Sequence, residues 1–273
     1  MRIALLWLGL LAGCATAPTS KPNVSVDPAL RLHGHNDYLQ PVPLTRALEY
    51  GLGSLEADIY LVDGELRVGH ERWQLRPWRT LEAMYLDPLF VMVKEHGSLR
   101  SDGLPLVLLV DIKADGAAVY RHLRTVLERY RDMLTQFVDG VVKPGAVTIL
   151  LSGNRPMKLV AADSTRLCAI DGHFSDLDVN PPPPVHLVPW VSGSWRSISD
   201  WTGTDELMEN ELQRLARLTG KARRQGRAVR FWGAPDRKEA WAAYYDLGID
   251  VICTDQPKKA AAWLREFRVN TAR

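Results

Sequence analysis

The sequence predicts an α/β fold, a single TIM-type (β/α)8 barrel. Three observations lead to this prediction: about eight short apolar runs recur along the chain, helical patterns separate most of them, and no glycine-rich dinucleotide turn follows the first run. A doubly wound open sheet would favour such a turn. The 273 residues and the 46% hydrophobic content suit one large domain with a packed core.

The predicted strands are short apolar and β-branched runs that lie between turn signals. They are Ala29–Leu32, Ser54–Ile59, Leu106–Asp111, Ala146–Leu151, Leu167–Ile170, Val185–Val191, Ala228–Trp232 and Asp250–Cys253. Leu106 to Val110 is continuously apolar, as expected of a strand that is buried on both faces. The turn from Val62 to Glu65 predicts a hairpin, with a short arm over Leu66–Gly69.

The predicted helices lie between the strands and repeat their apolar residues at helical spacing. They are Leu44–Tyr50, Ala117–Tyr130, Glu206–Arg224, Lys238–Leu247 and Lys258–Phe267. Gly51 and Gly248 follow two of them, at a position where glycine commonly ends a helix. The loop from Gly172 to Pro184 contains four consecutive prolines and is expected to be stiff.

The first residues are expected to lie outside the barrel. Arg2 precedes an apolar run from Ile3 to Ala12, which has signal-peptide length and is too short to span a bilayer. The run leads into Cys14 in a pattern that looks like a bacterial lipoprotein cleavage box, so Cys14 is the expected lipidation site. An ordinary secretory signal with an incidental cysteine is the alternative. We therefore expect a signal peptide over 1–13, a flexible tether over 14–28 and the barrel over 29–273.

This organisation predicts a lipid-anchored protein of the bacterial cell envelope that faces the periplasm, on the outer membrane. The lipid anchor would make the membrane a partner. The formal net charge of +2 gives no reason to expect a nucleic-acid partner. Cys168 and Cys253 lie in separate apolar runs, so two buried thiols are expected rather than a disulfide.

Carboxylate side chains gather where the second and third predicted strands end, which is the active-site face of a barrel. Glu56 and Asp58 are two residues apart on a strand, so both face the same side. Two neighbouring carboxylates resist ionisation unless a cation neutralises them. With Asp111 as a third carboxylate and Asn36 as an amide oxygen, this all-oxygen set favours one divalent cation, Ca²⁺ or Mg²⁺, over Zn²⁺.

Basic side chains lie near the same strand ends. Two histidines, His35 and His70, fit a general base and a general acid on opposite sides of a phosphorus atom. Lys113 would add positive charge at the phosphate. Trp232 ends the seventh predicted strand and either lines the substrate pocket or packs in the core. The ordinary alternatives are surface ion pairs for the acids, a helix N-cap for Asp111 and a loop position for His70.

Several segments resemble the phospholipase C-like phosphodiesterase superfamily, which includes glycerophosphodiester phosphodiesterases and phosphatidylinositol-specific phospholipases C. The resemblance covers the chain from about residue 30 to the end and is thin from Val142 to Trp201. The segments are His35-Asn36-Asp37-Tyr38, Gly51 to Asp58, Gly69-His70, Leu109 to Lys113, Val229 to Trp232 and Leu247 to Pro257.

The resemblance implies a role for each candidate residue. It implies that His35 is the general base, that His70 is the general acid, and that the metal ligands are Glu56, Asp58, Asp111 and Asn36. His35 is favoured over His33 because the residues after it match the His-Asn-x-Tyr opening of the superfamily. His33 would then support a neighbouring group or contact the phosphate.

The resemblance also implies the reaction, which is metal-dependent hydrolysis of a small phosphodiester. Glycerophosphodiesters or phospholipid-like molecules are the expected substrates, and a substrate hydroxyl that attacks first would give a cyclic phosphate. The chain lacks the His-Arg-Gly and Pro-Glu-Asn motifs of glycerophosphodiesterases, so the substrate stays open. One alternative is a non-catalytic barrel lipoprotein that binds phosphorylated lipids or envelope polymers. Another is a metal-dependent sugar isomerase or phosphatase.

Overall fold

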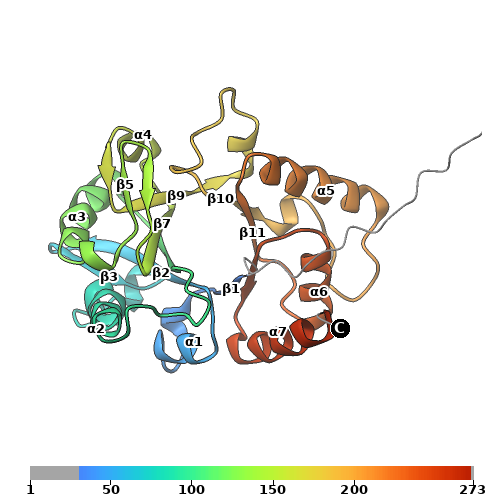
Figure 1. The fold of residues 1–273 in the computed structure, drawn as a ribbon, viewed down its shortest axis with the longest axis horizontal. Coiled ribbons are helices and arrows are strands. Elements are labelled where there is room, and N and C mark those ends of the chain that lie inside the picture. Colours follow the sequence, from blue (N-terminus) through green and yellow to red (C-terminus); the bar gives the residue numbers. More distant parts are fainter. Residues whose placement is uncertain (1–30, 272–273) are drawn as a thin grey trace, which may run out of the picture.

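A computed structural model of the chain describes residues 31–271, in which eight parallel strands close into a barrel. The strands, in order around the ring, are β1 (Arg31–Gly34), β2 (Ser54–Val62), β4 (Leu106–Ile112), β7 (Val147–Gly153), β9 (Cys168–His173), β10 (Trp190–Ser194), β11 (Ala228–Trp232) and β12 (Val251–Thr254). β1 pairs in parallel with β2 on one side and with β12 on the other, which closes the ring (Figure 1). The predicted TIM-type barrel is confirmed.

The α-helices lie around the outside of the ring of strands (Figure 1). They are α1 (Thr45–Glu49), α2 (Asp87–His96), α3 (Gly116–Glu128), α4 (Met157–Ala161), α5 (Glu209–Arg224), α6 (Lys238–Asp246) and α7 (Pro257–Thr271). The core lies between these helices and the strands. On α3, for example, the face with Val119, Leu123 and Leu127 is buried against the barrel. Burial of each such side chain contributes about 1.5–3 kcal/mol.

Short helical turns connect several of these elements. They are η1 (Asp37–Leu39), η2 (Arg72–Gln74), the π-helical turn η3 (Glu82–Leu86), η4 (Arg131–Met133), η5 (Phe174–Leu177) and η6 (Trp195–Ser197). Of these, η1 directly follows the end of β1 and its flanking residues enter the candidate site.

Two additions depart from regular barrel alternation. β3 (Glu65–Val68) runs antiparallel to β2, as the predicted hairpin arm does, and it brings the chain back so that Gly69 N–H donates to the carbonyl of Asp58 at 3.0 Å. The second addition was not predicted. It is a small three-stranded sheet formed by β6 (Val141–Lys143), β5 (Gln136–Val138) and β8 (Thr165–Arg166).

The sixth barrel strand begins later than the sequence predicts, at Trp190 instead of Val185. Upstream of it, the N–H groups of Leu187 and Val188 both donate to the carbonyl of Pro184, at 2.9 and 3.0 Å, in a turn. Pro189 then has no N–H to offer to a neighbouring strand. The strand therefore starts directly after this proline.

Three other predictions concern the N-terminus and the cysteines. The signal peptide (1–13) and the tether (14–28), which includes Cys14, lie outside the described residues. Among residues 31–271, no helix combines the length and the apolar character that crossing a membrane requires. Cys168 on β9 and Cys253 on β12 are both free thiols, but only Cys168 is fully buried, whereas Cys253 is partly exposed.

Candidate active site

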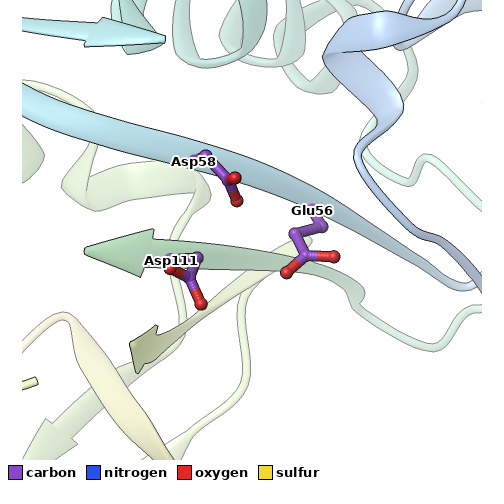
Figure 2. Close-up of side chains that lie close together, drawn as sticks. All are labelled: Glu56, Asp58 and Asp111. Carbon is purple, nitrogen blue, oxygen red and sulfur yellow. The ribbon is translucent and has the colours of Figure 1, made fainter. Parts of the chain in front are cut away.

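Three carboxylates meet at the carboxyl ends of two adjacent strands. Glu56 and Asp58 project from β2, and Asp111 projects from β4, where it pairs with Asp58 in the strand register. One oxygen from each carboxylate lies within 4.8 Å of the other two. Figure 2 shows the three side chains on these neighbouring strands, directed toward a common space. We call these three residues the acidic cluster.

Asp58 is fully buried, and three neighbouring side chains contact its carboxylate. Its Oδ2 accepts a hydrogen bond from the Tyr38 hydroxyl at 2.7 Å, and lies 2.7 Å from His70 Nδ1 and 2.8 Å from Lys113 Nζ. Its Oδ1 is buried and has no hydrogen-bond partner among the described residues. A buried polar atom without a partner is costly, and a cation bound at Oδ1 would remove that cost.

The other two carboxylates also make their protein contacts through one oxygen. Glu56 Oε2 accepts a hydrogen bond from Asn36 N–H at 3.4 Å and lies 3.4 Å from His33 Nε2. Asp111 Oδ1 lies 3.0 Å from Lys113 Nζ. Each member of the acidic cluster thus keeps a second oxygen that makes no hydrogen bond within residues 31–271. Three such oxygens fit a hard divalent cation.

The charges in the cluster act on the carboxyl pKa values in opposite directions. Burial favours a raised pKa for Glu56, but the hydrogen bond with His33 and the charge of Arg230 outweigh it and hold the pKa well below its usual range. Burial raises the pKa of Asp58, and the charge of Glu56 raises it further, while Lys113 opposes the shift. One ionised carboxylate therefore lies beside one that resists ionisation, the arrangement that a bound cation relieves.

His35 follows β1 and is held by a residue from the far end of the chain. Its Nδ1 lies 2.8 Å from Oδ1 of Asp255, which directly follows β12. Its Nε2 faces the acidic cluster, 3.2 Å from Asn36 Nδ2 and 3.8 Å from Glu56 Oε2. Burial acts to lower the pKa of His35, but the hydrogen bond with Asp255 and the charge of Glu56 outweigh it, so the pKa is raised.

Asn36 adopts a left-handed backbone conformation, with φ of 48°, which asparagine tolerates better than most residues. Its Oδ1 lies 2.8 Å from the Tyr38 hydroxyl oxygen, and the same hydroxyl donates its proton to Asp58. The amide oxygen predicted as a metal ligand therefore lies one hydroxyl group away from the acidic cluster.

His70 follows β3 and its side chain is half-exposed. Its Nδ1 contacts Asp58, and its backbone N–H donates to Oε1 of Gln74 at 2.8 Å. The imidazole is therefore oriented by a member of the acidic cluster, and Nε2 is left free to exchange a proton.

His33 is fully buried and does not line the cavity beside the cluster. Its Nδ1 lies 2.8 Å from Ser54 Oγ, and its Nε2 lies 3.4 Å from both Glu56 Oε2 and Arg230 Nη1. Of the two roles predicted for His33, the geometry favours support of a neighbouring group, Glu56, over direct contact with a phosphate.

A cavity of about 310 Å³ opens beside the acidic cluster. Five candidates from the sequence line it: His35, Glu56, Asp111, Lys113 and Trp232. Trp232 is 48% exposed, so its indole is available to a ligand. Asp58, which belongs to the cluster, is not among the lining residues, and neither are Asn36 and His70.

Sequence reasoning missed the other wall of the cavity, which Arg155, Asp171, Ser192 and Arg230 help to form. Arg230 is buried on β11, where Nη2 lies 3.0 Å from Asp171 Oδ2 and Nε donates to Ser192 Oγ at 3.0 Å. A single arginine inside the apolar run of β11 was the available signal. Asp255 was also missed, although it lies only two residues after a predicted strand.

The family model of the AIM6-like phosphodiesterase domain matches residues 23–170. A relative named altered inheritance of mitochondria protein 6 homolog, from Arthroderma benhamiae, is 28% identical and the match covers 85% of this chain and 83% of that protein. Altered inheritance of mitochondria protein 6 from Eremothecium gossypii is 27% identical, with 82% of this chain and 67% of that protein covered.

Two solved structures share the fold. A glycerophosphodiester phosphodiesterase from Parabacteroides distasonis aligns with a TM-score of 0.54 and 13% identity, over 89% of this chain and 98% of that one. A glycerophosphodiester phosphodiesterase from Agrobacterium tumefaciens aligns with a TM-score of 0.51 and 12% identity, over 86% of this chain and 99% of that one.

The relatives contradict the predicted localisation. They are fungal proteins whose names refer to mitochondria, so the expectation of a bacterial cell-envelope lipoprotein that faces the periplasm is wrong. The resemblance to phospholipase C-like and glycerophosphodiester phosphodiesterases is confirmed by the family model and by the shared barrel. The chain belongs to the AIM6-like phosphodiesterase domain family.

Proposed function

We propose that this protein cleaves small phosphodiesters of the glycerophosphodiester class, with a divalent cation bound at the acidic cluster. The observation that carries the proposal is the acidic cluster itself, whose oxygens lie within 4.8 Å of one another and whose Asp58 Oδ1 is buried without a partner. The names of the two solved neighbours support the substrate class.

The cation would be held by Glu56, Asp58 and Asp111, with the amide oxygen of Asn36 as a further ligand. An all-oxygen set of this kind suits Ca²⁺ or Mg²⁺. When bound, such a cation stabilises charge on a phosphoryl oxygen and lowers the pKa of a bound hydroxyl group.

The side chains around the cluster would move the protons. His35 accepts a proton at Nε2 from water or from a substrate hydroxyl, while Asp255 holds Nδ1 at 2.8 Å. His70 donates a proton from Nε2 to the leaving alkoxide, while Asp58 holds Nδ1 at 2.7 Å. Lys113, which lies between two of the acids, adds positive charge beside the phosphate.

The proposal is tested on the full chain with glycerophosphocholine, glycerophosphoinositol, a lysophospholipid and a phosphoinositide. Phosphorus NMR of the products separates a monoester from a cyclic phosphate. We expect turnover that EDTA abolishes and that Ca²⁺ or Mg²⁺ restores, and about a hundredfold loss or more in His35→Ala and His70→Ala.

His96→Ala, at an exposed histidine on α2, is the matched control and should keep full activity. Turnover that survives both EDTA and His35→Ala would overturn the mechanism. Binding of these diesters with no turnover under any metal would favour the non-catalytic alternative.

A further inference from the structure

Three lysine and arginine side chains line the cavity, and they differ in their partners. Lys113 Nζ lies 3.0 Å from Asp111 Oδ1, and Arg230 Nη2 lies 3.0 Å from Asp171 Oδ2. Arg155, which follows β7, has no carboxylate within 4.0 Å in the described part of the chain. It is therefore the one of the three that makes no ion pair there, although the charges of Asp171, Asp176 and Asp111 act on it from a greater distance.

Only neutral groups hold the guanidinium of Arg155. Its Nη1 donates to the carbonyl of Gly153 at 3.1 Å, and its Nε is buried with no hydrogen-bond partner within residues 31–271. Burial lowers the pKa of Arg155, but an arginine keeps its charge at neutral pH. A partly desolvated cation without a direct ion-pair partner is unfavourable, and an anion bound in the cavity would compensate it.

The end of β7 places Arg155 close to the acidic cluster, but among the described residues Arg155 forms no ion pair with it. Gly153 has a φ of +65°, and a Cβ at this position would lie 2.5 Å from Asp111 Oδ1. A glycine is needed for the strand to pass this close to the cluster. The chain then turns, and Arg155 lines the same cavity from the neighbouring strand end.

The cavity would hold one of the two alcohol groups of the diester. His35 lines it and His70 does not. On the proposed function, on which this inference rests, the part of the substrate next to His35 occupies the cavity, and the leaving alcohol departs past His70. Arg155 and Trp232 are then in reach of the alcohol that occupies the cavity.

We propose that Arg155 binds a second anionic group, separate from the reacting phosphate, on the alcohol that occupies the cavity. The preferred substrates are therefore phosphodiesters of an acidic alcohol, one that carries a carboxylate or a phosphate monoester. A neutral polyol would leave Arg155 without a direct ion-pair partner.

The test uses the full chain with Ca²⁺ and three p-nitrophenyl phosphodiesters that share one leaving group. Their second alcohol is glycerol, glycerate or glycerol phosphate. We expect kcat/KM to be about tenfold higher for the two acidic diesters than for the glycerol diester, as one charge-assisted hydrogen bond provides. In Arg155→Gln the ratio should fall to about one, and Arg155→Lys should keep part of it.

Arg121→Gln, at an exposed arginine on the outer helix α3, is the matched control and should keep the wild-type ratio. Equal losses on all three diesters in Arg155→Gln would leave the ratio unchanged and overturn the inference, because Arg155 would then act on the reacting phosphate. A wild type without preference would also overturn it.

Failure of the proposed function gives a different pattern. If no diester is cleaved, calorimetry with Ca²⁺ compares phosphoglycerate with glycerol phosphate as ligands. Tighter binding of phosphoglycerate that is lost in Arg155→Gln would support the anion site and reject only the cleavage reaction. Equal binding of the two ligands, or no binding of either, would overturn the inference as well.

Discussion

The two halves of the barrel's carboxyl end differ in charge and in how the chain builds them. The half at β2 and β4 presents the acidic cluster, whose oxygens lie within 4.8 Å of one another. The half at β7 to β11 presents Arg155 and Arg230, with only Asp171 to balance them in the cavity wall. One cavity therefore joins an acidic side to a basic side.

The halves also differ in how their residues are distributed along the sequence. Most of the acidic half comes from one stretch between His35 and His70, which contains β2 and its hairpin. The basic half takes single residues from β9, β10 and β11 and from the loop after β7. The family model covers residues 23–170 and ends one residue before Asp171. The family signature thus lies mainly in the half that would bind the metal.

Asp58→Asn should give the largest effect, because it removes the charge at the centre of the acidic half. We expect about a thousandfold loss of kcat, together with loss of Ca²⁺ binding in calorimetry. Asp63→Asn is the control. Asp63 is exposed in the turn before β3, with φ of 53°, a conformation that asparagine tolerates. Unchanged Ca²⁺ affinity in Asp58→Asn would place the cation elsewhere.

Arg230→Met tests the basic half of the cavity by its effect on the free energy of unfolding. The side chain is buried and pairs with Asp171 at 3.0 Å, so its loss leaves a buried carboxylate without a counter-charge, held only by the Ser192 hydroxyl. We expect the free energy of unfolding in urea to fall by about 3–5 kcal/mol. Arg131→Met, which breaks a partly exposed ion pair with Glu128, should cost less than about 1 kcal/mol. Similar losses in the two variants would contradict this contrast.

Asp255→Asn tests the pH dependence of the proposed base. The hydrogen bond with Asp255 raises the pKa of His35, and the base must be neutral to accept a proton. Without this carboxylate the pKa should fall, so the acid limb of the kcat/KM profile should move to lower pH. At neutral pH kcat should drop about tenfold, because the ring loses its orientation.

The control for that profile is Asp178→Asn, at an exposed carboxylate that pairs with Lys221 away from the cavity. Its profile should match the wild type. An acid limb that stays in place or moves to higher pH in Asp255→Asn would show that His35 is not the group that titrates.

His33→Gln should give the smallest effect, a change in stability that is seen only at acidic pH. Burial lowers the pKa of His33 below its ordinary 6.5, so the unfolded chain takes up this proton first. Stability should therefore fall as the pH drops below 6.5, by up to about 1.4 kcal/mol per pH unit, and this part should be absent in His33→Gln. Urea unfolding between pH 7 and 5 in EDTA measures the difference, with the exposed His96→Gln as control.

The sequence was sufficient to predict the barrel, because strands buried on both faces stand out as apolar runs such as Leu106 to Val110. The small sheet of β5, β6 and β8 was missed because its strands have two or three residues, and β6 is exposed throughout. Val185 to Val188 looks like a strand, but the flanking prolines set up a turn instead. This turn and the missing N–H of a proline therefore determine where β10 begins.

For the site, the sequence was sufficient to predict those residues that lie on one strand or on one short hairpin. Glu56 and Asp58 follow from the two-residue repeat of a strand, and His70 follows from the hairpin. Arg230 gave no comparable signal, because its partner Asp171 lies on another strand and a lone charge in an apolar run has several explanations. Contacts between distant strands depend on the order of strands around the ring.

The pairing of β1 with β12 has a consequence for the order of events during synthesis. His35 is made early, whereas Asp255, which orients it, is made more than two hundred residues later. A nascent chain that still lacks β12 has the acidic cluster and both histidines, but not the carboxylate that holds the base. The proposed base is therefore fully oriented only after the last strand has been translated and has joined the first.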